Sequence, residues 1–185
     1  MTSRRPIAAI VLSLILPAAH LLPPTAAGQK IDPPKATELQ WTNLETAVAK
    51  GAEHKKPVMV DVYTDWCGWC KKMDKEVFAD PAVSEVLGKH FALAKVNGES
   101  RETFTFKGEK TDGVGIARGF GVRGYPAIIF LDSDGDMLTM IPGFVNAEKF
   151  LPIVLFIGTR EFEKMEWPAY LAKYEAAKQA PARPK

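Results

Sequence analysis

The spacing of apolar residues along the chain predicts alternating strands and helices. Three short runs of β-branched and other apolar residues have the composition and polar boundaries of buried strands; they cover residues 57–64, 91–96 and 126–131. A turn at residues 132–135 joins the last run to a hairpin partner at 136–141. Apolar positions at helical spacing predict helices over residues 43–54, 68–78, 80–87, 114–120 and 146–157. This order predicts an α/β fold in which helices flank a central mixed sheet.

Capping residues mark several of the predicted helix ends. Thr42 begins a capping-box pattern, Asp80 precedes a first-turn proline, and Asn146 can cap the last of these helices. Residues 98–110 are polar and have no strong period, so we expect a loop or insertion there. In residues 167–174, a proline in the first helical position predicts a C-terminal helical extension.

The first 27 residues have the layout of a secretory signal peptide. Two arginines precede an apolar run, and small residues at 25–27 form a cleavage signal. An uncleaved membrane anchor is the alternative, but Pro17 and His20 interrupt the run, which is shorter than the roughly 20 apolar residues of a spanning helix. We therefore expect a signal peptide at 1–27, a linker at 28–38, one domain with its C-terminal extension at 39–178, and a disordered tail at 179–185.

The balance of charge argues against two classes of partner. Of the 24 Lys and Arg residues, Arg4 and Arg5 lie in the predicted signal peptide, which leaves 22 basic residues against 22 acidic ones. No later segment concentrates basic residues enough to bind nucleic acid, and no second apolar run is long enough to span a membrane. The sequence therefore predicts an exported, soluble protein that meets neutral or mixed-charge partners.

The only two cysteines, Cys67 and Cys70, follow directly after the first predicted strand. Cys67 falls at the start of a helix, where the helix dipole and free backbone N–H groups stabilise a thiolate. Cys70 lies on the same face one turn deeper, where it can form a disulfide with Cys67 but is poorly placed to meet another protein first. The pattern predicts that an exposed Cys67 attacks a target disulfide and that Cys70 resolves the mixed disulfide.

Other uses of a cysteine pair are less well supported by the sequence. A zinc site needs four ligands, and the two histidines after the signal peptide, His54 and His90, do not have zinc-site spacing. Haem attachment requires a histidine directly after the second cysteine, where this chain has Lys71. A structural disulfide here would close too small a loop to add much stability. The sequence therefore favours redox chemistry by the cysteine pair, with no metal or other cofactor.

Two separated segments resemble the thioredoxin family. Residues 60–71 resemble its strand, active-site turn and helix, and residues 121–130 resemble its Gly-Val-x-x-x-Pro segment. The resemblance covers residues 40–158 and is closest to exported members, namely periplasmic thioredoxins and the C-terminal domain of DsbD-type reductases. It implies a thioredoxin fold in which Pro126 is cis and lies beside the disulfide.

The resemblance gives roles to two charged residues. It implies that Asp61 is a buried acid that assists proton transfer at the second cysteine. An acid in an apolar strand is costly to bury unless it is paired or protonated, which favours a functional role for it. It also implies that Lys95, in the next strand, pairs with Asp61. The alternatives are an Asp61 that faces solvent at a strand edge and a Lys95 that extends its ammonium group to the surface.

The resemblance also implies a substrate-binding surface around the cysteines. Trp66 would cover the active-site turn, and Tyr125 would offer its backbone to an extended substrate segment, unless Pro126 is an ordinary trans proline at the start of a strand. Trp69 replaces the proline of common members, at a position that tunes the stability of dithiol relative to disulfide. The implied substrate-binding set is Trp66, Trp69, Tyr125, Pro126 and Gly143, with Gly68 and Lys95 in support.

These observations predict a periplasmic thiol-disulfide oxidoreductase that reduces protein disulfides. Its partners would be disulfide-containing or thiol proteins and a membrane electron donor of the DsbD or CcdA type, and the chain would act as a monomer. The alternative is a protein-binding module whose cysteines are incidental or bind metal. Asp61, Trp66 and Pro126 favour the enzyme, because binding alone does not require them around a cysteine pair.

Overall fold

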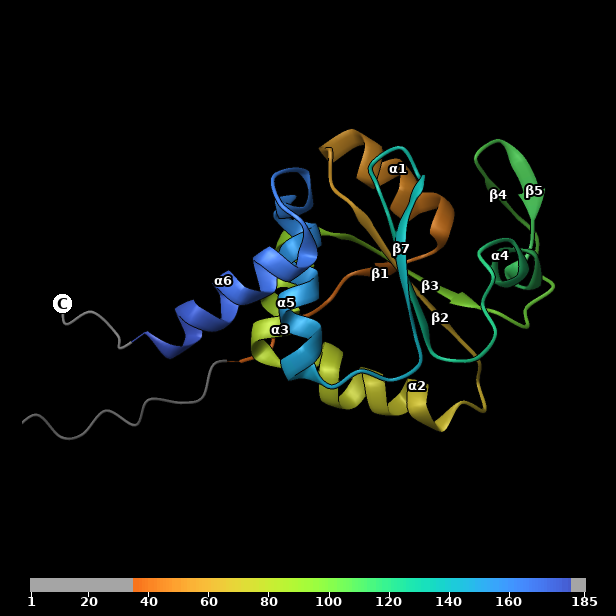
Figure 1. Ribbon diagram of the computed structural model, residues 1–185. Helices are drawn as coiled ribbons and strands as arrows, with labels where there is room; N and C mark the ends of the chain where they lie inside the picture. The colour runs from red at the N-terminus through yellow and green to blue at the C-terminus, as the bar shows by residue number, and fades with distance from the viewer. Residues whose placement is uncertain (1–34, 181–185) are drawn as a thin grey trace, which may run out of the picture. The chain divides into compact units, whose positions relative to one another are not determined.

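The computed structural model describes residues 35–180. The predicted signal peptide, most of the predicted linker and residues 181–185 lie outside this range. Within it, none of the helices is long and apolar enough to cross a membrane. Figure 1 shows the elements, which are β1 (Trp41–Thr42), α1 (Leu44–His54), β2 (Val58–Tyr63), α2 (Gly68–Met73), the π-helix η1 (Asp74–Phe78), α3 (Pro81–His90), β3 (Ala92–Asn97), β4 (Phe104–Phe106), β5 (Glu109–Thr111), α4 (Gly113–Gly119), β6 (Ala127–Leu131), β7 (Met137–Pro142), α5 (Ala147–Gly158), the 3₁₀-helix η2 (Glu161–Glu163) and α6 (Trp167–Gln179).

Five of the strands form a mixed sheet in the order β1-β3-β2-β6-β7. Strand β2 lies at its centre, where it pairs in parallel with β3 and antiparallel with β6. Strands β2 and β3 are joined through α2, η1 and α3, as a parallel pair requires. The central mixed sheet with flanking helices confirms the predicted fold class.

Strand β2 lies between two clusters of buried side chains, because successive residues of a strand point to opposite faces of the sheet. Val58, Val60 and Val62 belong to the cluster that includes residues of α1 and α4. Met59 belongs to the other cluster, which includes residues of α2, α3 and α5. Asp61 lies two residues after Met59, so its side chain points to the face that α2 covers. The alternation of apolar residues in β2 therefore decides that Asp61 faces the helix that carries the cysteines.

The capping box predicted at Thr42 is wrong. Asn43 caps α1 instead, and its Oδ1 accepts a hydrogen bond from the Thr46 amide at 2.8 Å. Thr42 belongs to the two-residue strand β1, and its hydroxyl donates to the Leu93 carbonyl oxygen at 3.0 Å. A strand this short has no periodicity that the sequence could display, so its pairing with β3 was not predicted. The caps predicted at Asp80 and Asn146 are confirmed.

The loop predicted at residues 98–110 contains a hairpin, β4–β5. Lys107 and Gly108 form its turn with positive φ angles of 51° and 82°, as two-residue hairpin turns require. Phe104 and Phe106 are half-buried against the cluster that includes α1 and α4. Strands of three residues are too short for the alternation of polar and apolar residues to be recognised, which is why the sequence indicated a loop or insertion without assigning its strands.

The predicted C-terminal helical extension is present as α6, which packs on α5 through aromatic rings. The ring of Phe156 in α5 lies 5.4 Å from that of Trp167 and 4.9 Å from that of Tyr170, measured between centroids. The proline of this helix is its second residue rather than its first, and the helix continues to Gln179. It is longer than the predicted 167–174, because Ala, Lys and Gln are good helix formers and prolong it past the last aromatic residue.

The first residue of α4 provides a test of how this helix packs. A Cβ atom on Gly113 would lie 1.9 Å from the Asn97 carbonyl oxygen at the end of β3, so the backbone would have to move. We expect Gly113→Ala to lower the free energy of unfolding by about 1–3 kcal/mol, as overpacking does, when measured by urea denaturation. At the other end of α4, nothing lies within 4 Å of the Cβ position of Gly119. Gly119→Ala should therefore leave stability unchanged or raise it by up to about 1 kcal/mol, and equal stability of the two variants would contradict this packing.

Candidate active site

The two cysteines form a disulfide at the N-terminus of α2. Strand β2 ends at Tyr63, and a short turn, in which the Cys67 amide donates to the Thr64 carbonyl oxygen, leads into the helix. Cys67 is the N-cap residue, and its Sγ accepts a hydrogen bond from the Cys70 amide at 3.0 Å. The sulfur of Cys67 thus occupies the position where a helix N-terminus stabilises negative charge.

The prediction that Cys67 is exposed is wrong for this oxidised state. Cys67 is 3% exposed and Cys70 is 4% exposed, so accessibility does not distinguish them. The Cys67 sulfur is bonded to Cys70 and accepts its amide hydrogen, which turns it toward the helix rather than toward solvent. Gly68, between them, is exposed and has nothing within 4 Å of its Cβ position.

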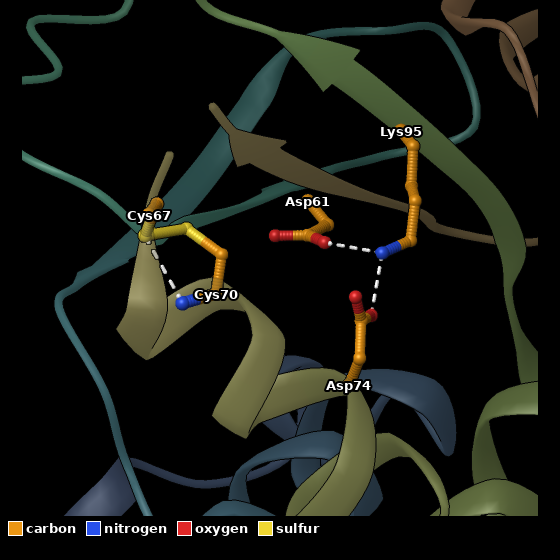
Figure 2. Close-up of polar contacts among 5 residues, drawn as sticks. All are labelled: Asp61, Cys67, Cys70, Asp74 and Lys95. Carbon is orange, nitrogen blue, oxygen red and sulfur yellow. Dashed lines mark hydrogen bonds and ion pairs between the residues drawn. A yellow bond between two sulfur atoms is a disulfide. The ribbon is translucent and has the colours of Figure 1, made fainter. Parts of the chain in front are cut away.

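Asp61 is buried, as the resemblance implied, and its carboxyl group lies beside the disulfide (Figure 2). It is 1% exposed because β2 is a central strand, which excludes the alternative of a solvent-facing residue at a sheet edge. The register of β2 and β3 places Asp61 beside Lys95, and the Oδ2 atom lies 3.0 Å from the Lys95 ammonium nitrogen. Among the described residues, the buried Oδ1 atom has no hydrogen-bond partner. Figure 2 shows this free oxygen on the side of the carboxyl group that faces the disulfide.

Burial changes the acidity of Asp61. The loss of solvent raises its pKa and the charge and hydrogen bond of Lys95 lower it; together with a small rise from Asp74, the net change is from 3.8 to about 6. A carboxyl group with a pKa near 6 can both accept and release a proton close to neutral pH. The position is therefore suited to proton transfer.

A second carboxylate, Asp74, was not predicted. It lies at the start of η1, and its Oδ1 atom accepts a hydrogen bond from Lys95, whose ammonium group bridges the two carboxylates (Figure 2). Burial alone would lower the pKa of Lys95, but the attraction of Asp61 and Asp74 raises it. The spacing of four residues from Cys70 to Asp74 is one helical turn, and this signal could have revealed that Asp74 lies on the side of α2 that faces β3.

Aromatic rings enclose the ammonium group of Lys95. It lies 4.9 Å from the ring centroid of Trp41, 5.4 Å from that of Tyr63 and 5.8 Å from that of Phe78. The Lys95 side chain is only 26% exposed. These contacts exclude a lysine that extends freely to the surface, and they hold the positive charge beside Asp61.

Two tryptophans expose large apolar surfaces next to the disulfide. Trp66 is 68% exposed, and its indole nitrogen donates to Glu99 Oε2 at 3.0 Å while its ring contacts the edge of the Tyr125 ring. Trp69 is 57% exposed, and its ring centroid lies 5.3 Å from that of Phe144. The sequence did not identify Glu99 or Phe144, because each becomes part of the site only through the folding of a distant loop.

The segment around Pro126 also meets the site. The Tyr125–Pro126 peptide bond is cis, and the Gly143 amide donates to the Pro126 carbonyl oxygen at 2.8 Å. The Tyr125 ring packs on Gly98, where a Cβ atom would lie only 2.6 Å from it. A hollow of about 640 Å³ lies beside this segment. It is lined by residues 121–125, by Ala127, by Met140 and Pro142 of β7, and by Gly143. Gly143 therefore lies beside Tyr125 and Pro126, as the resemblance implied.

A metal site is not visible in the described part of the chain. Within residues 35–180, no group of three or more His, Cys, Asp or Glu side chains is arranged to hold an ion. The group with redox chemistry in this range is the disulfide itself.

Comparison with known proteins agrees with this geometry. A family model described as a thioredoxin-like domain matches residues 44–158. The chain is 34% identical over 110 residues to the thiol:disulfide interchange protein DsbD of Pectobacterium atrosepticum. That match covers 58% of this chain but only 17% of the DsbD protein, so the chain spans a small part of the length of this relative.

Two solved structures have a similar fold. A thioredoxin from Thermus thermophilus has 26% sequence identity and a TM-score of 0.54, with 64% of this chain and 85% of that one covered. A thioredoxin-fold protein from Helicobacter pylori has 20% identity and a TM-score of 0.58, with coverage of 67% and 82%. These similarities confirm the predicted thioredoxin fold.

The raised pKa of Asp61 predicts a pH dependence of stability. Because the folded state holds the proton more tightly than the unfolded chain, this contribution to stability is complete below about pH 4 and is lost as the pH rises through about 6. The free energy of unfolding of the wild type, relative to Asp61→Asn, should fall by about 3 kcal/mol between about pH 4 and pH 7.5. Urea denaturation across this range measures the difference, and a difference independent of pH would contradict the assigned burial.

The ion pair with Lys95 predicts a further change in the acidity of Asp61. Lys95 lowers the Asp61 pKa through its charge and its hydrogen bond, so Lys95→Met should raise that pKa beyond about 6. Titration of the Asp61 carboxyl carbon by ¹³C NMR measures the shift. Lys72→Met removes an exposed lysine of α2 and is the control. The assignment is wrong if Lys95→Met leaves the Asp61 pKa unchanged or lowers it.

Proposed function

Since the chain belongs to the thioredoxin-like family of disulfide oxidoreductases, we propose that it reduces disulfide bonds in other exported proteins. The observation that supports this most strongly is the free, buried Oδ1 atom of Asp61, which faces a disulfide at a helix N-terminus. A protein that only binds partners has no need of an acid with a pKa near 6 at this position.

The first step is the attack of Cys67 on a disulfide of the substrate. In the reduced protein, the N-terminus of α2 favours the Cys67 thiolate, whose sulfur forms a bond to one substrate sulfur. The substrate disulfide breaks, and its second sulfur leaves as a thiolate that takes up a proton. The product is a mixed disulfide between Cys67 and the substrate.

The second step is resolution by Cys70. Its thiol must lose a proton before it can attack the Cys67 sulfur, and the free Oδ1 atom of Asp61 accepts that proton. The new Cys67–Cys70 bond releases the second substrate thiolate, so two electrons pass from the dithiol to the substrate. Asp61 then returns its proton to solvent. Lys95, which is paired with both Asp61 and Asp74, compensates the negative charge that remains.

The same acid supports reduction rather than oxidation. When Asp61 is ionised, its negative charge disfavours a second negative charge on a nearby thiolate. The reduced form then gains less stability from thiolate formation, while the disulfide is neutral and unaffected. A couple whose reduced form is less stabilised gives up its electrons more readily.

The surface around the disulfide suits an extended substrate segment. Among the described residues, none forms a backbone hydrogen bond with the amide or carbonyl group of Tyr125, so both groups are open to a substrate strand. Trp66 and Trp69 supply apolar surface close to the cysteines, and Gly143 leaves room beside Pro126. In this proposal, the backbone groups set the position of the substrate and the two indole rings exclude water.

The proposed location is the periplasm, and the proposed electron source is a membrane protein. A dithiol in an oxidising compartment becomes a disulfide unless another protein keeps it reduced. The predicted signal peptide and the similarity to part of DsbD support this location. A membrane thiol protein of the DsbD or CcdA type would return two electrons to the Cys67–Cys70 disulfide after each cycle.

Substitution of the cysteines tests the division of labour. Cys70→Ser cannot resolve the mixed disulfide, so it should accumulate covalent complexes with substrates that dithiothreitol releases, as seen on non-reducing gels from periplasmic extracts. Cys67→Ser is the matched control and should form few or none, because Cys70 is one turn deeper in the helix. Absence of complexes from Cys70→Ser, or equal amounts from both variants, would contradict the mechanism.

A further inference from the structure

Lys72 lies over the two aromatic rings on one side of the disulfide. Its ammonium nitrogen is 5.2 Å from the ring centroid of Trp69 and 5.2 Å from that of Phe144. Lys72 follows Trp69 by three residues, so both side chains lie on the same face of α2. Trp69, Phe144 and Lys72 form what we call the Trp69 cluster: an apolar surface with one positive charge next to the disulfide.

The charge of Lys72 is only weakly neutralised within the chain. The carboxylate paired with it is that of Glu76, whose Oε2 atom lies 3.7 Å away, and both side chains are largely exposed at 43% and 54%. An exposed pair of this length contributes little energy, and water competes for both groups. Lys95, by contrast, is bound by two carboxylates and enclosed by rings. Lys72 therefore keeps most of its capacity to attract a carboxylate from another molecule.

The opposite side of the site carries the opposite charge. Asp65 and Glu99 are exposed near Trp66, where Asn97 donates to Asp65 and Trp66 donates to Glu99. Glu99 follows β3 and Phe144 follows β7, and these strands are separated in the sheet by β2 and β6. A substrate segment that crosses the disulfide thus passes from an acidic flank to a basic flank.

We propose that the Trp69 cluster selects disulfide proteins that carry an acidic residue beside the cysteine under attack. This inference rests on the proposed function and adds the class of substrate to it. The methylene groups of a Glu or Asp side chain, or an apolar neighbour, would lie on the Trp69 and Phe144 rings, while the carboxylate meets Lys72. A basic residue at the same place would be repelled by Lys72.

The test compares two synthetic disulfide peptides that differ only in whether Glu or Lys flanks the attacked cysteine on the side that meets Trp69. Each flank is varied separately, because the Trp66 side should show the reverse preference. The reduced wild-type protein should reduce the Glu peptide about fivefold faster than the Lys peptide in kcat/KM, the size expected of one exposed ion pair of about 1 kcal/mol. The preference should decrease at high ionic strength, since salt screens exposed charges.

Charge reversal at Lys72 identifies the residue responsible. Lys72→Glu should invert the ratio of the two rates, and Lys72→Gln should bring it close to one. Lys75→Glu makes the same change of net charge at an exposed lysine of the adjoining η1 helix and should keep the wild-type ratio. Equal effects of Lys72→Glu and Lys75→Glu would overturn the inference, because the ratio would then report only the net charge of the protein.

An uncharged substrate separates failure of this inference from failure of the proposed function. Hydroxyethyl disulfide carries no charge, so the reduced wild type should reduce it whatever the charge preference. If the wild type reduces hydroxyethyl disulfide and reduces both peptides at the same rate, the proposed substrate selectivity is wrong and the proposed function is supported. If the wild type reduces neither hydroxyethyl disulfide nor the peptides, the proposed function is wrong and the selectivity falls with it.

Discussion

The site depends on one constraint, which is that the Asp61 carboxyl group is buried next to a disulfide and is only half satisfied. One oxygen is bound by Lys95, and the other has no partner among the described residues. Burial of the ionised carboxylate costs free energy, and this cost raises the pKa of Asp61. In the proposed mechanism, a proton taken from Cys70 neutralises Asp61, so the cost of burying the ionised carboxylate favours resolution of the mixed disulfide.

The fold holds this arrangement in place from several directions. The central position of β2 keeps water from Asp61, and the parallel register with β3 places Lys95 beside it. Helix α2 brings the disulfide to one side of the carboxyl group, and η1 adds Asp74, which rises from the helix to the Lys95 ammonium group (Figure 2). Separation of β2 from β3 would leave the buried Asp61 without Lys95, which is strongly destabilising. Lys95 thus links the carboxylate of the central strand to Asp74 of η1, while buried Met73, Val77 and Phe78 pack this segment on the sheet.

Local sequence predicted the parts of the site that depend on short-range patterns. Strand β2, the cysteine pair and the caps Asp80 and Asn146 follow from periodicity and from the preferences of single residues. The partnership of Asp61 and Lys95 came from resemblance to a family, because pairing between strands is not visible in periodicity. Glu99, Phe144 and β1 depend on contacts between distant segments, and the burial of Cys67 depends on the oxidised state.

The reduction potential of the Cys67–Cys70 couple is the most direct test of this account. It is measured by equilibrating the protein with mixtures of reduced and oxidised glutathione at pH 7 and determining the fraction of the protein in the dithiol form. If the ionised Asp61 disfavours the thiolates, the couple is a reductant, and its potential should lie near the value of about −270 mV found for thioredoxin. A potential near the value of about −120 mV found for DsbA would contradict the account, because it requires a strongly stabilised dithiol above the buried acid.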